Sequence, residues 1–287
     1  MQSFPVNREL SRRRMLAGLS AASASVAFAP SFSSMVSAAS PVKAPFKLGI
    51  QIYSLRDYPV NEAIQHAKDL GFEQIEFFNG MLSQDSSQEQ IDALLSKLDQ
   101  LGLSISGYGV VGFGGDAAAN RKVFEFAKKA KIKIITADPS PESFASLNDL
   151  VKEFDIKIAI HNHGPSHRYN KAVDVLRAIE KQDERIGACA DLGHFIRSGE
   201  QPVDVIRTLQ GRLYGIHLKD FAEMKEKTHG VILGKGHLNC QEVFDALVRA
   251  NFPADGALSL EYEENPQNPI EDIRQCVAIA QKALATL

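Results

Sequence analysis

The sequence has no tryptophan and only three cysteines among its 287 residues. Three widely spaced cysteines are too few for the disulfide framework that stabilises small secreted domains. The chain also lacks an apolar run of the roughly 20 residues that a membrane-spanning helix needs. Basic side chains are not in excess, since 32 lysines and arginines stand beside 35 acidic residues. A nucleic-acid-binding domain is normally strongly basic. We therefore expect a globular protein with neither a stable membrane anchor nor a nucleic-acid partner.

The first 39 residues resemble an export signal more than a folded domain. Arg12 and Arg13 precede a weakly apolar, Ala/Ser-rich stretch over 16–28, and further small residues follow it. A charged start, an apolar middle and a small-residue cleavage site are typical of a signal peptide, and paired arginines indicate the twin-arginine route. We predict a cleavable twin-arginine signal peptide over 1–39, the twin-arginine translocase as partner during export, and a periplasmic location. A disordered basic tail or an amphipathic anchor is the alternative.

From residue 47 onward, short apolar runs alternate with segments whose apolar residues recur at three- and four-residue spacing. The expected strands cover 47–55, 74–78, 104–110, 133–139, 157–164, 186–194, 213–220 and 256–262. The expected helices cover 60–70, 88–101, 121–130, 144–154, 171–181, 202–209, 240–251 and 269–284. Apolar strands that alternate with helices indicate a parallel sheet covered by helices. Eight such units in about 240 residues suit a closed (β/α)8 barrel. We predict the α/β class and one TIM barrel over 40–287, with a doubly wound open sheet as the alternative.

Polar side chains gather at the ends of the later strands, where a barrel carries its active site. Seven of the eight histidines lie between positions 161 and 237. Three consecutive strands end in His or in Asp followed by His, and the last strand ends in Glu. Imidazole and carboxylate without thiolate suit Mn, Zn, Co, Ni or Fe(II). Buried carboxylates such as Asp191 and Glu261 would repel each other unless a cation or a proton intervened. We predict one divalent metal ion there, with Mn, Zn, Co and Mg as the candidates.

Seven motifs at these strand ends occur in an order that resembles the xylose isomerase-like TIM-barrel superfamily of sugar phosphate isomerases and epimerases, which is related to endonuclease IV. The motifs are L-G-I-Q-I-Y-S-L-R-D (48–57), I-E-F-F (75–78), I-A-I-H-N-H-G (158–164), D-L-G-H (191–194), I-H-L-K-D (216–220), L-G-K-G-H-L-N (233–239) and L-E-Y-E (260–263). The resemblance implies a metal held by one residue from each of strands five to eight. These residues are His161, Asp191, His217 and Glu261. It also implies a substrate-binding set of Gln51, Tyr53, Glu76 and His194.

One position departs from the superfamily's pattern. Its ketose 3-epimerases place on strand five a Glu that binds the metal and moves a proton, whereas this sequence has His161. Epimerisation with two bases needs a pair of groups on opposite faces of the substrate. With Glu261 as the remaining carboxylate, His163 or Lys219 would have to supply the second base. Endonuclease IV needs further His ligands on early strands, which are absent here, so a DNA-repair function is disfavoured.

The leading hypothesis is a divalent-metal-dependent sugar isomerase or epimerase that acts on a small carbohydrate. It would abstract a proton next to a metal-chelated carbonyl, with Glu261, His163 and Lys219 as catalytic candidates. Residues two apart on a strand share a face, so His163 should lie about 7 Å along the strand from His161 and contact the substrate, not the same ion. A lyase that acts on oxidised (3-keto) glycosides is the alternative. A sugar-binding protein without catalysis is the second alternative.

Overall fold

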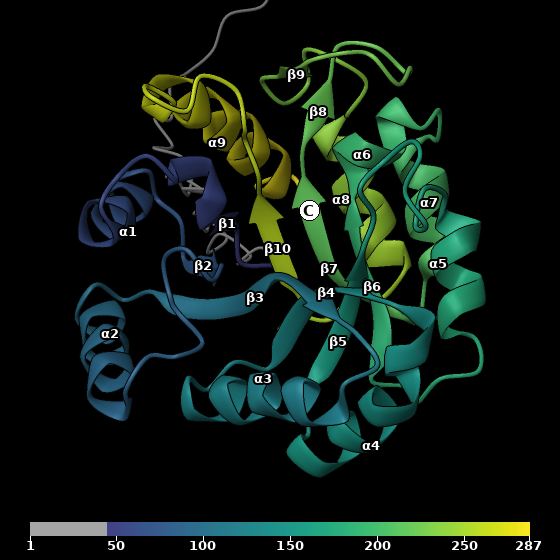
Figure 1. Ribbon diagram of the computed structural model, residues 1–287. Coiled ribbons are helices and arrows are strands. Elements are labelled where there is room, and N and C mark those ends of the chain that lie inside the picture. The colour runs from purple at the N-terminus through teal and green to yellow at the C-terminus, as the bar shows by residue number, and fades with distance from the viewer. Residues whose placement is uncertain (1–44) are drawn as a thin grey trace, which may run out of the picture. The chain divides into compact units, whose positions relative to one another are not determined.

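A computed structural model describes residues 45–287, in which eight parallel strands form a closed barrel (Figure 1). The strands are β1 (Gly49–Gln51), β2 (Gln74–Phe77), β3 (Ser104–Phe113), β4 (Ile134–Pro139), β5 (Lys157–His161), β6 (Ile186–Asp191), β7 (Leu213–Leu218) and β10 (Ala257–Leu260). The barrel closes where β1 pairs with β10. The predicted α/β class and (β/α)8 architecture are confirmed. The predicted signal peptide over 1–39 lies outside the described residues.

Helices follow the strands and cover the outside of the barrel (Figure 1). They are α1 (Val60–Asp69), α2 (Gln88–Gln100), α3 (Ala117–Lys129), α4 (Phe144–Phe154), α5 (Ala172–Ile179), α6 (Leu192–Arg197), α7 (Pro202–Leu209), α8 (Cys240–Arg249) and α9 (Ile270–Leu284). All eight expected helices are present, and α6 is additional. Gly71, Gly102 and Gly211 follow helices with φ values of 89°, 66° and 82°. Glycine adopts this left-handed conformation, which ends a helix, at the least cost.

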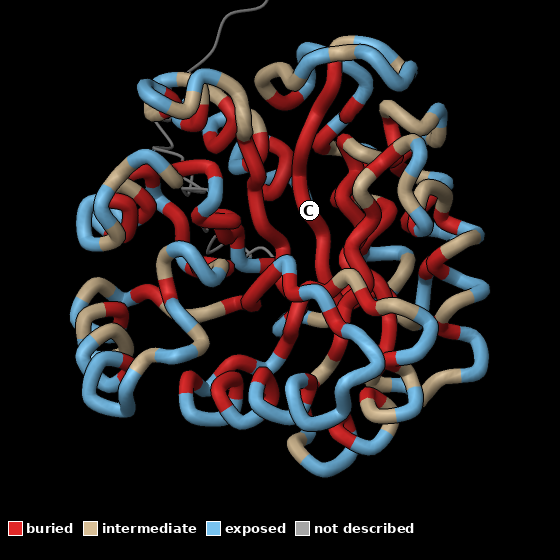
Figure 2. Tube along the Cα trace, viewed as in Figure 1, coloured by how far each residue is buried: buried red, intermediate tan, exposed pale blue. Residues whose placement is uncertain are grey.

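The core lies in and around the strands. Every residue of β2, β6, β7 and β10 is buried. Figure 2 shows buried residues along the strands and exposed residues on the outer sides of the helices. Burial on both faces explains why the strands are continuous apolar runs, not alternating ones. Among residues 45–287, no helix is long and apolar enough to cross a membrane.

Two expected strands end early because a side chain caps a helix. Gln51 accepts a hydrogen bond from the Tyr53 amide at 3.1 Å and begins the 3-10 helix η1 (Ile52–Leu55). Asp191 accepts one from the His194 amide at 2.7 Å and begins α6. A side-chain oxygen that satisfies a free amide stabilises a helix start. The expected strands over 47–55 and 186–194 therefore become strand–helix turns, which place Gln51 and Asp191 at the C-terminal end of the barrel.

The long connection between β7 and α8 is organised by the buried side chain of Asp220. It contains the two-stranded antiparallel sheet of β8 (Asp220–Phe221) and β9 (Gly230–Val231). The Asp220 carboxylate accepts hydrogen bonds from five backbone amides at 2.7–3.0 Å, those of Phe221, Gly234, Gly236, His237 and Leu238. A Cβ atom at Gly236 would lie 2.1 Å from the Phe221 carbonyl oxygen. The loop therefore needs glycine there so that its backbone can approach Asp220.

Candidate metal centre

The four predicted metal ligands meet at the C-terminal end of the barrel. His161, Asp191 and His217 lie on β5, β6 and β7, and Glu261 directly follows β10. One nitrogen or carboxylate oxygen from each residue lies within 4.8 Å of those of the other three. All four side chains are buried. The structure thus brings together, from four separate elements, a cluster that could hold a metal ion.

The donor atoms of this cluster fit a divalent ion. His161 Nε2 lies 3.1 Å from His217 Nδ1 and 3.5 Å from Asp191 Oδ2. His217 Nδ1 lies 3.1 Å from Glu261 Oε2. Asp191 Oδ2 is buried and lies near three nitrogen atoms, those of His161 at 3.5 Å, His217 at 3.8 Å and Lys219 at 3.1 Å, and a buried carboxylate needs positive charge of this kind or a bound cation. Two imidazoles and two carboxylates are ligands that first-row divalent ions accept.

Glu76 lies behind His217. Its Oε2 is 3.0 Å from His217 Nε2 and accepts a hydrogen bond from Ser259 Oγ at 2.7 Å, while its Oε1 accepts one from Thr136 Oγ1 at 2.5 Å. A carboxylate on the far nitrogen of a ligand histidine fixes the tautomer and the ring orientation. The Glu76 side chain is completely buried. Glu76 does not line the cavity described below, so this position does not support the predicted contact between Glu76 and the substrate; the carboxylate orients His217 instead.

Asp191 is held in place by its backbone as well as by its side chain. Asn162 accepts a hydrogen bond from the Asp191 amide at 2.8 Å and donates one to the Asp191 carbonyl at 3.0 Å. The Asn162 side chain thereby continues the pairing between β5 and β6 beyond the end of β5. Sequence reasoning missed this residue. Its signal was its place between His161 and His163, directly after the end of β5.

Lys219 forms an ion-pair cluster beside the predicted ligands. Its Nζ lies 2.7 Å from Glu261 Oε2, 3.1 Å from Asp191 Oδ2 and 3.4 Å from Glu263 Oε1. Burial disfavours the charge, but these carboxylates outweigh it and raise the Lys219 pKa above its ordinary value. Burial would likewise raise the Glu261 pKa, yet Lys219 and His217 hold it well below its ordinary value. The pair is thus an ammonium and a carboxylate, and Lys219 can donate a proton but not accept one.

A cavity of about 340 Å³ opens next to these groups. Its walls include seven residues predicted from the sequence: Gln51, Tyr53, His161, His163, His194, Lys219 and Glu261. Sequence reasoning missed Phe78, Val110 and Glu263, which also line it. Tyr53 packs edge-on against Phe78 at a ring-centroid distance of 5.2 Å. The cavity therefore has an aromatic wall together with the charged groups around the metal cluster.

His163 lines this cavity, as expected of a substrate-contacting residue, but a loop positions it and not strand β5. Strand β5 ends at His161, so His163 lies on the following loop and the spacing along a strand does not apply. Its ring centroid nevertheless lies 4.6 Å from that of His161. Burial, with smaller effects of His161 and His167, lowers the His163 pKa to about 3. The imidazole is therefore neutral near pH 7 and lies where a substrate beside the metal cluster could contact it.

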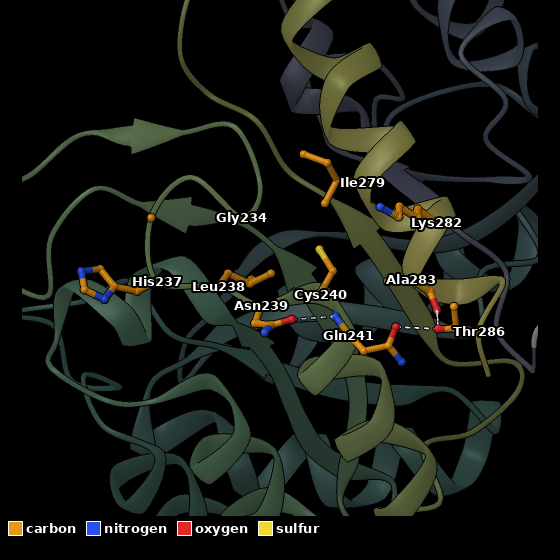
Figure 3. Close-up of a pocket in the computed structure, with 11 residues that line it drawn as sticks. Gly234, His237, Leu238, Asn239, Cys240, Gln241, Ile279, Lys282, Ala283 and Thr286 are labelled. Atoms are coloured by element: carbon orange, nitrogen blue, oxygen red, sulfur yellow. Dashed lines mark hydrogen bonds between the residues drawn. The ribbon is translucent and has the colours of Figure 1, made fainter.

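A larger cavity of about 530 Å³ lies elsewhere, against α8 and α9 (Figure 3). Figure 3 shows that its walls come from the loop before α8, the start of α8 and the C-terminal part of α9, with Cys240, Gln241, Lys282 and Thr286 among them. None of the residues predicted as ligands, catalytic groups or substrate contacts lines this cavity. The smaller cavity is therefore the one that coincides with the candidate chemistry.

Comparisons with known proteins agree with the motifs. Residues 139–280 match the family described as xylose isomerase-like TIM barrel. The inosose dehydratase of Clostridium tetani is 30% identical over 144 residues, which are 44% of this chain and 47% of that protein. The inosose dehydratase of Lacticaseibacillus casei is 27% identical over 143 residues, 44% of this chain and 47% of its own. The matches thus span about half the length of these curated relatives.

Solved structures extend the similarity across the barrel. A protein of uncharacterised function from Parabacteroides distasonis has 29% identity and a TM-score of 0.66, with 83% of this chain and 99% of that chain covered. The 3-keto-D-glucoside 4-epimerase of E. coli has 15% identity and a TM-score of 0.65, with 83% and 99% covered. At that identity the likeness concerns the fold alone. The resemblance inferred from the seven motifs is confirmed.

Proposed function

Since this chain carries a xylose isomerase-like TIM barrel, we propose that it is a divalent-metal-dependent enzyme that removes a proton next to the ketone of a cyclic keto-sugar or keto-polyol. The observation that carries the proposal is the buried cluster of two imidazoles and two carboxylates beside a cavity that contains an ammonium–carboxylate pair. The names inosose dehydratase and 3-keto-D-glucoside 4-epimerase both denote a ring ketone, which supports this substrate class.

His161, Asp191, His217 and Glu261 would hold the metal ion. A divalent ion bound there supplies Lewis acidity, which polarises a carbonyl and acidifies the adjacent C–H bond. Glu76 and Asn162 would keep His217 and Asp191 in the orientation that binding needs. The aromatic wall of Tyr53 and Phe78 would hold the apolar face of a sugar ring.

Glu261 is our candidate for the base, because it lines the cavity and its carboxylate pairs with the Lys219 ammonium. Its carboxylate would take the proton from the carbon next to the ketone, and the C–H electron pair would form an enolate. When the ketone re-forms, the electrons can expel an oxygen from the next carbon. Lys219 would protonate that departing oxygen as a general acid. The net reaction is the loss of water or of an alcohol from the substrate, and it needs no oxidant or reductant.

We favour elimination over epimerisation for two reasons. Of the two carboxylates in the cluster, only Glu261 lines the cavity, because Asp191 lies completely buried below it. The curated relatives reported above are dehydratases. The isomerase or epimerase hypothesis keeps one supporting observation, since His163 lines the same cavity and could return the proton to another face of the ring. The two outcomes share the first step and differ in the product.

The test is incubation of the full chain with Mn²⁺ and a panel of inososes and 3-keto glycosides in D₂O, followed by NMR. Elimination releases water or an alcohol and gives an unsaturated product, whereas epimerisation gives deuterated, inverted substrate. Glu261→Gln should abolish both. Glu223→Gln is the control, because Glu223 is exposed, pairs with Lys225 and does not line the cavity. Sugar binding without deuterium exchange or product for the whole panel would contradict the proposal and favour a non-catalytic sugar-binding protein.

A further inference from the structure

A second cluster of possible metal ligands lies beside the first and shares no residue with it. It consists of Asp138 near the end of β4, His163 after β5, and His167 in the loop that follows. One nitrogen or carboxylate oxygen from each of the three lies within 4.8 Å of those of the other two. Because the carboxyl ends of β4 and β5 are neighbours in the barrel, both clusters lie at its catalytic end.

Two atoms of this cluster lack the partners that buried polar atoms normally have. Asp138 Oδ1 and His163 Nδ1 are buried and make no hydrogen bond within residues 45–287. His167 Nε2 lies 3.3 Å from Asp138 Oδ2, while the rings of His163 and His167 approach to a centroid distance of 4.7 Å. Nearly all buried polar groups in native proteins find a partner. Three ligand atoms that converge within 4.8 Å, on side chains that also carry two unpartnered buried atoms, are what a metal-binding site presents.

We propose that Asp138, His163 and His167 bind a second divalent transition-metal ion. Two imidazoles and one carboxylate form a three-ligand set that leaves positions open for water or for a substrate oxygen. The side chains of Asp138 and His167 are 24% and 26% exposed, so an ion can reach them from solvent. His163 also lines the substrate cavity, which places this ion next to whatever occupies the cavity. The site does not depend on the proposed reaction.

The second ion binds more weakly than the first. The first cluster has two carboxylates, whereas the second has only that of Asp138. Arg168 is also a competitor, because its Nε lies 3.6 Å from Asp138 Oδ1. The Arg168 side chain is 44% exposed and can turn towards solvent when an ion binds. We expect a difference in affinity of about tenfold or more, the scale on which neighbouring groups change metal affinity.

The test is a calorimetric titration of the metal-free full chain with Zn²⁺ alone, with bound zinc counted by elemental analysis. The wild type should bind two ions per chain, one tightly and one about tenfold or more weakly. His167→Ala should bind one, with the tight affinity unchanged. His229→Ala should still bind two, because His229 is exposed and belongs to neither cluster.

Saturation of the wild type at one ion per chain would overturn the proposal, and so would retention of two ions by His167→Ala. Asp191→Ala separates the two sites, since it should lose the tight ion and keep the weaker one. If His167→Ala does not fold, Asp138→Asn provides the same readout, because it removes the charge of the cluster's only carboxylate. Full occupancy of both sites in folded Asp138→Asn would equally refute the assignment.

Discussion

Replacing Glu76 by glutamine would test how strongly the metal cluster depends on a residue that binds no metal itself. The carboxylate lies 3.0 Å from His217 Nε2 and accepts hydrogen bonds from Ser259 and Thr136. Glutamine keeps the shape and can keep one oxygen towards His217 and Ser259. The Thr136 hydroxyl can rotate to accept from the new amide. The substitution therefore removes mainly the negative charge that makes His217 a stronger ligand.

Loss of such a supporting partner typically weakens metal binding about 10- to 100-fold. Because each tenfold change is about 1.4 kcal/mol, the expected cost for Glu76→Gln is about 1.4–2.8 kcal/mol. The lower end applies if the glutamine amide reproduces the hydrogen bonds. Glu76→Ala should lie at or beyond the upper end, because it also leaves His217 free to rotate.

The assay is competition between the protein and a chelating dye for Zn²⁺ at the tight site, with circular dichroism to confirm folding. Glu73→Gln is the matched control, since Glu73 precedes the same strand and is exposed. A folded Glu76→Gln protein that binds Zn²⁺ as tightly as wild type would show that Glu76 does not support His217.

Three further predictions concern the ligands, the cavity and export. Asp191→Ala should lose the tightly bound ion in elemental analysis, because one of four ligands and its charge are removed; a full complement of tight metal would refute the ligand assignment. His163→Ala should keep the tight ion and lose most turnover, whereas His161→Ala should lose both. If His163→Ala loses the ion and His161→Ala keeps it, then His163 is the metal ligand and His161 is not. We also propose export by the twin-arginine route, so replacing Arg12 and Arg13 with lysine should leave precursor in the cytoplasm on fractionation, and an undiminished periplasmic fraction would contradict it.

Periodicity predicted the barrel and strand-end chemistry predicted a metal site, while the family resemblance assigned the four clustered residues to it. Each ligand lies at the end of an apolar run, so its position in a parallel barrel follows from the strand order. The short helices η1 and α6 could not be predicted from periodicity. Each begins where a side chain, that of Gln51 or Asp191, caps the helix start and thereby ends the preceding strand. An apolar stretch of this length fits a strand or a short buried helix equally well.

Contacts between residues that are distant in the sequence could not be predicted from the sequence. Glu76 meets His217, 141 residues away in sequence, because β2 and β7, which are separated by β1 and β10 in the barrel, each direct one of these side chains into its interior. The family resemblance implied substrate binding for Glu76, and no sequence signal pointed to His217 as its partner. Asp138 lies on β4 and His167 in the loop after β5, and neither belongs to a recognisable motif. Asp138 meets His163 and His167 only when β4 and β5 pair in the barrel.

The five amides that Asp220 holds give the loop after β7 a fixed shape within the protein itself. Ordering a backbone costs about 1–2 kcal/mol of conformational entropy per residue. This loop loses its conformational entropy when the barrel folds, before any ligand binds. The segment next to Lys219 consequently need not become ordered again when a sugar enters the cavity, and more of the contact energy remains as affinity. The carboxylate of Asp220 thus contributes to recognition through rigidity, without a polar contact to the ligand.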